Sequence, residues 1–268
     1  MLSIKVLDRD NKTIEVSRGE EEVNLVCARE YREGDRIILE TDGEPGYLWL
    51  QMDDALGRSL VYVTGNVSYS IPFGEKRISY SPKAFYGSPH LITARKAVRP
   101  ARTAKDYEIK AYRNLAYNIN DQHGAANCFP HASANVETRG EAVFAARNAI
   151  DGVTVNSSHG EWPYESWGIN RQDDAVMRID FGRTVEVDQV VLYTRADFPH
   201  DNWWKKAVLT FSDGSTLDLD MKKSALPHIK DFEKKQINWI EISQLIKSKE
   251  PSPFPALTQM EVYGTDLL

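Results

Sequence analysis

The stretch AVMRIDFGRTVEVDQVVLY, residues 175–193, decides the fold class of this chain. Apolar and polar side chains alternate from Met177 to Phe181 in the segment 175–181, and residues 187–193 are rich in β-branched residues, so both segments are predicted to be β-strands. The turn Ser212-Asp213-Gly214 predicts a hairpin between two further strands. The strands expected around these segments are 207–211, 215–219, 236–240 and 258–263. The second half of the chain is therefore expected to form a β-sandwich.

The first 98 residues show the same kind of pattern. Short apolar runs are separated by turn residues, which is typical of an antiparallel sandwich. These runs are residues 2–7, 22–26, 36–40, 47–51, 60–63 and 90–94. Residues 99–111 are polar and basic at their start and interrupt the pattern. The predicted fold class is all-β, with two β-sandwich domains at 1–98 and 112–268 joined by a linker at 99–111.

Composition excludes several classes of protein. The chain has 268 residues, of which 41% are hydrophobic, so it can bury two cores. Its net charge of -6 disfavours nucleic acid as a partner, because nucleic-acid-binding surfaces are usually basic. No apolar run approaches 18 residues, and the first residues do not resemble a signal peptide, so we expect no membrane span and a cytoplasmic location. A leader in a longer natural chain would instead make the protein secreted.

Several ordered motifs in the second half carry a family resemblance. They include Arg113-Asn114-Leu115-Ala116, Ala146-Arg147-Asn148-Ala149-Ile150-Asp151-Gly152, Met177-Arg178-Ile179-Asp180-Phe181-Gly182 and Met260-Glu261-Val262-Tyr263-Gly264. Over residues 112–268 the chain resembles the discoidin-like or coagulation-factor type C domains, also described as galactose-binding-like, and is nearest to bacterial family 32 carbohydrate-binding modules. The resemblance implies a jelly-roll sandwich whose loops at one end bind a glycan.

The resemblance also implies a structural calcium ion near the Asp151-Gly152 turn. Ca2+ takes six to eight hard oxygen ligands, which carboxylates, amide carbonyls and hydroxyls supply. The candidate ligands are Asn148, Asp151, Thr154, Asn156 and Glu261. The Thr-x-Trp ending that is usual in the family is absent here, and an ordinary Asp-Gly turn without metal is the alternative.

Two loop-like segments, 158–174 and 194–205, combine aromatic with ionisable residues. A sugar ring stacks its apolar face on an aromatic side chain, and its hydroxyls bond to forked polar groups. The candidate ligand-binding residues are His159, Glu161, Trp162, Tyr164, Arg195, Asp197, His200, Asp201, Trp203 and Trp204. One of the adjacent Trp203 and Trp204 is expected to be buried, because neighbours on a strand point to opposite faces. Arg171 is expected in a solvated turn, and pairing of Arg195 with Asp197 is an alternative to ligand binding.

The function predicted from these residues is carbohydrate binding. Two alternatives stay open at this point. Glu161, Glu165, Asp197 and Asp201 could supply the acid and base of a glycoside hydrolase, although we expect binding rather than catalysis. The chain could also be a scaffold for protein interactions. The sequence leaves the glycan, the role of the first domain and the oligomeric state open.

Overall fold

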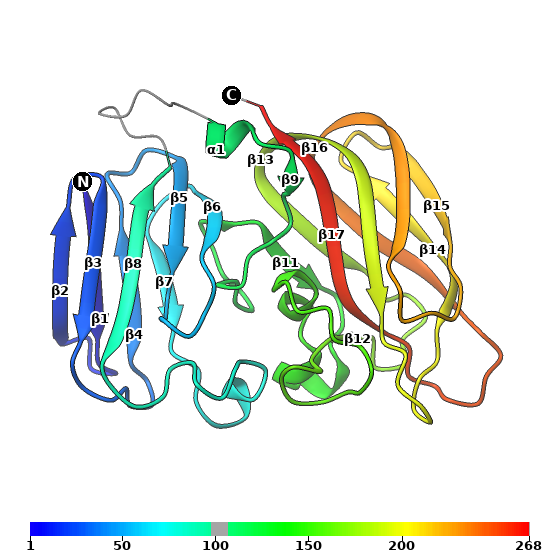
Figure 1. Cartoon of the computed structure of the whole chain (residues 1–268), viewed down its shortest axis with the longest axis horizontal. Coiled ribbons are helices and arrows are strands. Elements are labelled where there is room, and N and C mark those ends of the chain that lie inside the picture. The colour runs from blue at the N-terminus through cyan, green and yellow to red at the C-terminus, as the bar shows by residue number, and fades with distance from the viewer. Residues whose placement is uncertain (98–106, 268) are drawn as a thin grey trace.

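The computed structural model describes residues 1–97 and 107–267, and it confirms an all-β fold. Two sandwiches of antiparallel strands lie side by side along the long axis (Figure 1). Each sandwich has its own cluster of buried apolar side chains. No helix in the described part of the chain is long and apolar enough to cross a membrane.

The first sandwich packs a four-stranded sheet, with the order β2-β1-β4-β7, against a five-stranded sheet, with the order β10-β6-β5-β8-β3. The edge strand β10 (Cys128–Phe129) comes from the segment between the sandwiches. Its strands are β1 (Leu2–Leu7), β2 (Thr13–Gly19), β3 (Glu22–Cys27), β4 (Arg36–Glu40), β5 (Gly46–Gln51), β6 (Ser59–Val63), β7 (Val67–Ser70) and β8 (His90–Lys96), and η1 (Gly74–Arg77) follows β7. In β3, Val23, Leu25 and Cys27 are buried and the residues between them are exposed, as alternation predicts. The sequence pattern missed β2, which has no buried residue, and β7.

The segment between the sandwiches connects them closely. It contains α1 (Tyr107–Lys110), β9 (Arg113–Asn114), β10 (Cys128–Phe129), β11 (His131–Ala134), η2 (Thr138–Gly140), η3 (Ala142–Phe144) and η4 (Ala146–Ile150). Most of the linker predicted at 99–111 lies outside the described residues, and its end forms α1. The domain boundaries predicted from the sequence placed residues 128–129 in the second domain. In the structure these residues form β10, which pairs with β6 in the first sandwich. Asn120 also bonds to the backbone of the first sandwich, at Leu50 and Met52.

The second sandwich is built around three long strands, β13 (Met177–Thr194), β16 (His228–Lys247) and β17 (Ala256–Asp266). The shorter strands β12 (Trp167–Gly168), β14 (Trp204–Phe211) and β15 (Thr216–Asp220) complete it together with β9 and β11. The two strands predicted within 175–193 are one continuous strand, β13, with a register shift between Asp180 and Val185. Its first part pairs with β11 and its last part with β17, while β16 pairs along its other side, so β13 is a central strand of this sandwich.

The two sandwiches touch through polar and aromatic contacts. The guanidinium of the buried Arg147 lies 4.3 Å from the ring centre of Tyr80 in the first sandwich. The amide of Trp162 donates a hydrogen bond to the carbonyl of Ile78 over 2.9 Å. These contacts fix the loops of the second sandwich that lie on this side.

Gly182 allows the bend in β13, because no other residue fits its backbone conformation and its close contact with Phe129 without strain. Its φ of 66° lies in the left-handed region, and an added Cβ would lie 2.3 Å from the ring of Phe129. We expect Gly182→Ala to lower the free energy of unfolding in urea by about 3 kcal/mol, through backbone strain and overpacking together.

Gly214→Ala is the matched control for this variant. Gly214 has a similar φ of 83°, but an added Cβ would meet no atom within 4 Å. It should lose only about 1 kcal/mol, from strain alone. Equal losses for the two variants would contradict the proposed contact with Phe129.

Candidate functional site

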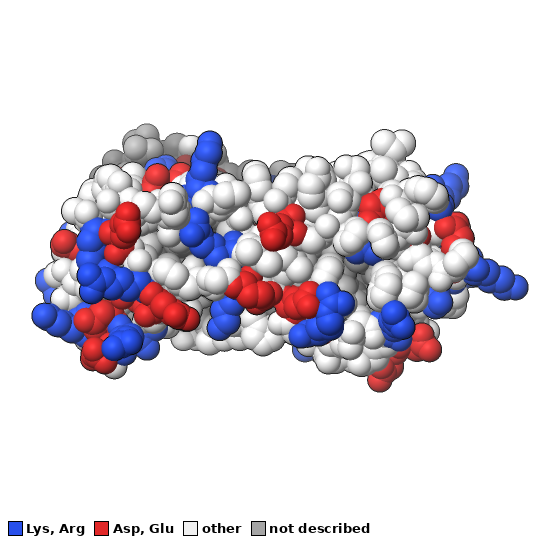
Figure 2. Space-filling model, turned by 90° about the horizontal axis from the view of Figure 1, so that it is seen from below, with Lys and Arg blue, Asp and Glu red and all other residues white. Residues whose placement is uncertain are grey.

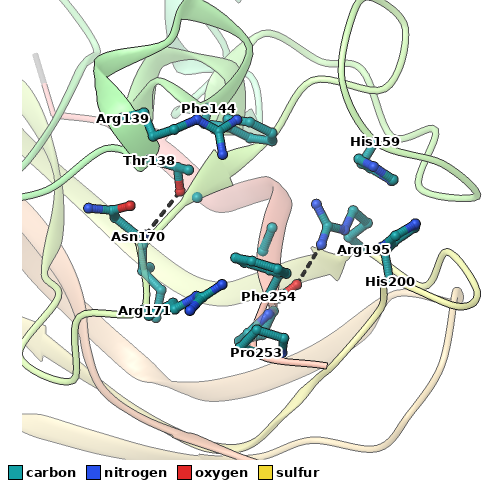
Figure 3. Close-up of a pocket in the computed structure, with 14 residues that line it drawn as sticks. Thr138, Arg139, Phe144, His159, Asn170, Arg171, Arg195, His200, Pro253 and Phe254 are labelled. Atoms are coloured by element: carbon teal, nitrogen blue, oxygen red, sulfur yellow. Dashed lines mark hydrogen bonds between the residues drawn. The ribbon is translucent and has the colours of Figure 1, made fainter. Parts of the chain in front are cut away.

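A pocket of about 160 Å3 lies at one end of the second sandwich (Figure 3). Four regions of the chain form it: the turns η2 and η3, the loop that carries His159, β12 with the loop after it, and the end of β13 and start of β17 with their adjoining loops. The lining residues are Thr138, Arg139, Phe144, His159, Gly168, Ile169, Asn170, Arg171, Arg195, His200, Pro253, Phe254, Pro255 and Ala256. The volume is below the 300–1,000 Å3 of pockets that hold drug-sized ligands, so it suits a small group such as one sugar ring.

The pocket wall combines apolar surfaces with forked donors. Phe144 and Phe254 provide aromatic faces, and two prolines adjoin Phe254. The guanidinium of Arg139 lies 5.8 Å from the ring centre of Phe144, and that of Arg171 lies 4.6 Å from the ring centre of Phe254. Each pair therefore offers an apolar surface next to a group that donates several hydrogen bonds.

The loop after β12 holds Asn170 and Arg171 in an uncommon conformation. Both residues have positive φ, 49° and 62°, which costs energy in residues other than glycine. The loop is fixed by two bonds: the amide of Gln172 donates to the carbonyl of Ile169, and the amide of Asn170 donates to Thr138 Oγ1 over 2.9 Å. The second bond also connects this loop to the turn that carries Arg139.

A buried ion pair forms the opposite side of the pocket. Arg195 Nε lies 2.6 Å from Asp197 Oδ1, although its N–H does not point along a hydrogen bond, and Arg195 Nη2 donates to the carbonyl of Phe254 over 2.5 Å. Burial lowers the pKa of Arg195, and the carboxylates of Asp197 and Asp201 oppose this effect. Asp197 Oδ2 also bonds to Nδ1 of His159, whose ring packs edge-on against His200. The predicted pairing of Arg195 with Asp197 is confirmed, and it coexists with a place for Arg195 in the pocket wall.

The structure brings together some of the predicted binding residues and separates others. His159, Arg195 and His200 line the pocket, while Asp197 and Asp201 are buried behind it. Glu161, Trp162 and Tyr164 belong to a turn that faces the first sandwich, and they do not line the pocket. Glu161 and Trp162 are exposed there, so all three stay predicted ligand-binding residues that lie outside this pocket.

The adjacent tryptophans also have different positions. Trp204 is only 1% exposed and packs near Trp167 in the core, so its prediction as a ligand-binding residue is wrong. Its neighbour Trp203 is half-buried, and its indole N–H donates to Glu250 over 3.2 Å outside the pocket. The expectation that one of the pair is buried is therefore confirmed.

Sequence reasoning missed several residues of the pocket wall. Arg139, Phe144 and Phe254 lie in segments that had no unusual composition, and only the folded chain brings them to this end of the sandwich. Arg171 was expected in a solvated turn; it is exposed, but it also lines the pocket. Phe198, in the loop between Asp197 and His200, is 90% exposed and does not line the pocket.

The five predicted calcium ligands do not share one set of oxygens. The side-chain oxygen of Asn148 accepts from Arg147, and the amide of Asn156 donates to the carbonyls of Thr194 and Ala225. Thr154 is exposed, and Glu261 accepts a bond from Tyr263. The residue of β17 that contacts the Asp151-Gly152 turn is Gln259, whose side-chain oxygen accepts from the amide of Gly152. Of the predicted set, only Asp151 keeps a carboxylate that suits a metal ion.

Glu165 supplies a second buried carboxylate beside Asp151. Both side chains are almost fully buried, and neither Glu165 oxygen has a hydrogen-bond partner that meets normal geometry. Burial raises the pKa of both carboxyls, and the neighbouring Asp151 carboxylate raises the pKa of Glu165 further, whereas the guanidinium of Arg147 opposes the rise at Asp151. The nearest cation is Arg147, whose Nη2 lies 3.9 Å from Asp151 Oδ2. Such a pair needs a shared proton or a further cation, so these two residues fit a hard metal ion.

Comparisons with known proteins give a family model and several solved structures. The family model describes a domain of unknown function (DUF7402) and matches residues 124–252. No curated protein matches the chain.

The chain is similar to several solved carbohydrate-binding modules and lectin domains. One is chitosan-binding module 1 from the chitosanase/glucanase of Paenibacillus sp. IK-5, with 18% identity over 56% of this chain and 98% of the module and a TM-score of 0.40. Another is the family 32 carbohydrate-binding module of C. perfringens NanJ in complex with galactose, with 18% identity over 49% and 91% and a TM-score of 0.38. A fucose-binding module of Streptococcus pneumoniae has 14% identity over 57% and 96%, with a TM-score of 0.42.

Proposed function

We propose that the pocket at the end of the second sandwich binds a saccharide. The observation that carries this proposal is the composition of its wall. Aromatic rings of Phe144 and Phe254 alternate with the forked donors Arg139, Arg171 and Arg195 around a space of about 160 Å3. A sugar ring requires this combination, since it has an apolar C–H face and a rim of hydroxyls that accept hydrogen bonds.

Binding is supported better than glycoside hydrolysis. A glycosidase needs two carboxyl groups that flank the bond to be cleaved, about 5 to 10 Å apart. No carboxylate is among the described residues that line the pocket. Asp197 is engaged with Arg195 and His159, and Asp201 lies 3.5 Å from Lys223 Nζ. Glu161 lies on the turn beside the first sandwich, so the carboxylates considered for catalysis do not face a common ligand.

Phe254→Ala tests the saccharide proposal, because Phe254 offers the aromatic face and supports Arg171. A glycan array identifies bound saccharides, and calorimetry then measures Kd for one of them. We expect Phe254→Ala to weaken binding about tenfold or more, which corresponds to loss of one stacking contact of about 1.4 kcal/mol.

Tyr86→Ala is the matched control. Like Phe254, Tyr86 is an aromatic residue with an arginine over its ring, since Arg77 lies 4.8 Å from the ring centre, but Tyr86 is exposed and belongs to the first sandwich. It should leave Kd unchanged. An array without any bound glycan, or wild-type affinity in Phe254→Ala, would overturn the proposal.

We also propose that Asp151 and Glu165 hold the calcium ion that the sequence predicted. The support is the buried carboxyl of Glu165, which lies next to the buried carboxyl of Asp151 and has neither oxygen in a hydrogen bond of normal geometry. A bound ion would supply the positive charge that compensates this pair. It would hold the loop of Glu165 against the Asp151-Gly152 turn, and so stabilise the end of the sandwich that carries the pocket.

Thermal unfolding in excess calcium and in a chelator tests this ion. We expect calcium to raise Tm by about 5 °C or more, because a ligand that binds only the folded state stabilises it. Glu165→Gln should abolish the shift. Glu161→Gln, which changes an exposed carboxylate nearby, should retain it. The same Tm for the wild-type protein with calcium and with chelator would refute the proposal.

A further inference from the structure

The pocket wall is cationic, although the chain as a whole has a net charge of -6. Three guanidiniums, those of Arg139, Arg171 and Arg195, line it, and no carboxylate does so among the described residues. Figure 2 shows that charges of both signs are mixed on the face seen from below, so that face has no one-sided charge. The excess of arginine is therefore a local feature of this pocket.

Two of the three arginines have their own counter-charge. Arg139 bonds to both carboxylate oxygens of Glu141, at 2.5 and 2.7 Å, and Arg195 lies against Asp197. Both carboxylates lie outside the pocket wall. They hold the two guanidiniums in place and leave part of each fork for another partner.

Arg171 differs from them because no carboxylate of the described chain lies within ion-pair distance of it. Its guanidinium instead lies over the ring of Phe254, which supports the charge but leaves the N–H groups at the guanidinium edge free. The backbone around it is held at positive φ and bonded to Thr138, so the position of Arg171 is built into the fold. A fixed arginine without a counter-charge, in a pocket wall with two further arginines, matches the recognition of an anion.

We propose that the saccharide bound in this pocket carries an anionic group, either the carboxylate of a uronic acid or a sulfate ester. The inference rests on the proposed saccharide-binding function and adds the substrate class. The sugar ring packs against Phe254 or Phe144, and the anionic group accepts paired hydrogen bonds from Arg171 and an adjoining guanidinium. Carboxylate and sulfate oxygens have the spacing that a guanidinium fork binds in a bidentate manner.

Calorimetry with two matched pairs of probes tests the charge and separates its two sources. The first pair is oligogalacturonides and the same oligogalacturonides with methyl-esterified carboxylates. The second pair is sulfated galactan oligosaccharides and their desulfated forms. We expect the charged member of at least one pair to bind about tenfold tighter or more, which is the contribution of one charge-assisted hydrogen bond. The preference should decrease as salt increases.

Arginine variants connect this preference to the pocket. Arg171→Gln should abolish the preference for the charged probe, so that both members of a pair bind about equally, while the affinity for the neutral probe stays unchanged. Arg139→Gln should reduce this preference in part. Arg178→Gln is the matched control, because Arg178 also lies on an aromatic ring, that of Trp239, and pairs with a single glutamate, Glu241. It should retain the full preference. Unfolding midpoints in urea show that each variant is folded.

The outcomes separate this inference from the proposed function. Equal affinity within both pairs, or a preference that neither Arg171→Gln nor Arg139→Gln changes, overturns the anionic substrate class. Binding of other, neutral glycans that depends on Phe254 leaves the saccharide function in place in that case. If no saccharide binds, both proposals fail.

Discussion

The pocket depends on one buried ion pair, that of Arg195 and Asp197 directly after β13. Removing two charges from water is costly, and a buried pair persists only where further hydrogen bonds compensate it. Here Arg195 also bonds to the carbonyl of Phe254, and Asp197 bonds to His159 and, through its carbonyl, to the amide of Asp201. The pair therefore connects the end of β13, the entry to β17 and the loop of His159. A charge that is fixed in this way can face a ligand without rearrangement, which reduces the entropic cost of binding.

The fold could be predicted from the sequence because strand patterns are local. Alternation in β3 and the apolar residues of β13 follow directly from the side chains. The polar edge strand β2 escaped prediction, since a strand with no buried residue has no apolar signal. The continuity of β13 also escaped it, because the bend at Gly182 resembles a turn in the sequence.

The site was predictable only in part. His159, Arg195 and His200 stood out because they follow or precede strands in segments of unusual composition. Phe254 and Arg139 did not, since their role depends on which loops the sandwich brings to one end. Trp204 illustrates the opposite error: a large aromatic residue beside polar neighbours resembled a binding residue, although the strand directs it into the core. Composition therefore identifies candidate loops, while topology selects the side chains that meet in them.

The short strand β10 covers an edge of the first sandwich, although it follows that sandwich's own strands in the sequence. Cys128 and Phe129 pair with Val63 and Tyr62, and thereby cover the outer edge of the five-stranded sheet. A fragment cut at the predicted linker would lack these residues and would expose free amide and carbonyl groups along β6. Uncovered edges of this kind pair with other chains and lead to aggregation. The first sandwich is thus completed by residues that lie beyond its own sequence boundary, so we expect the two halves of the chain to fold as one unit.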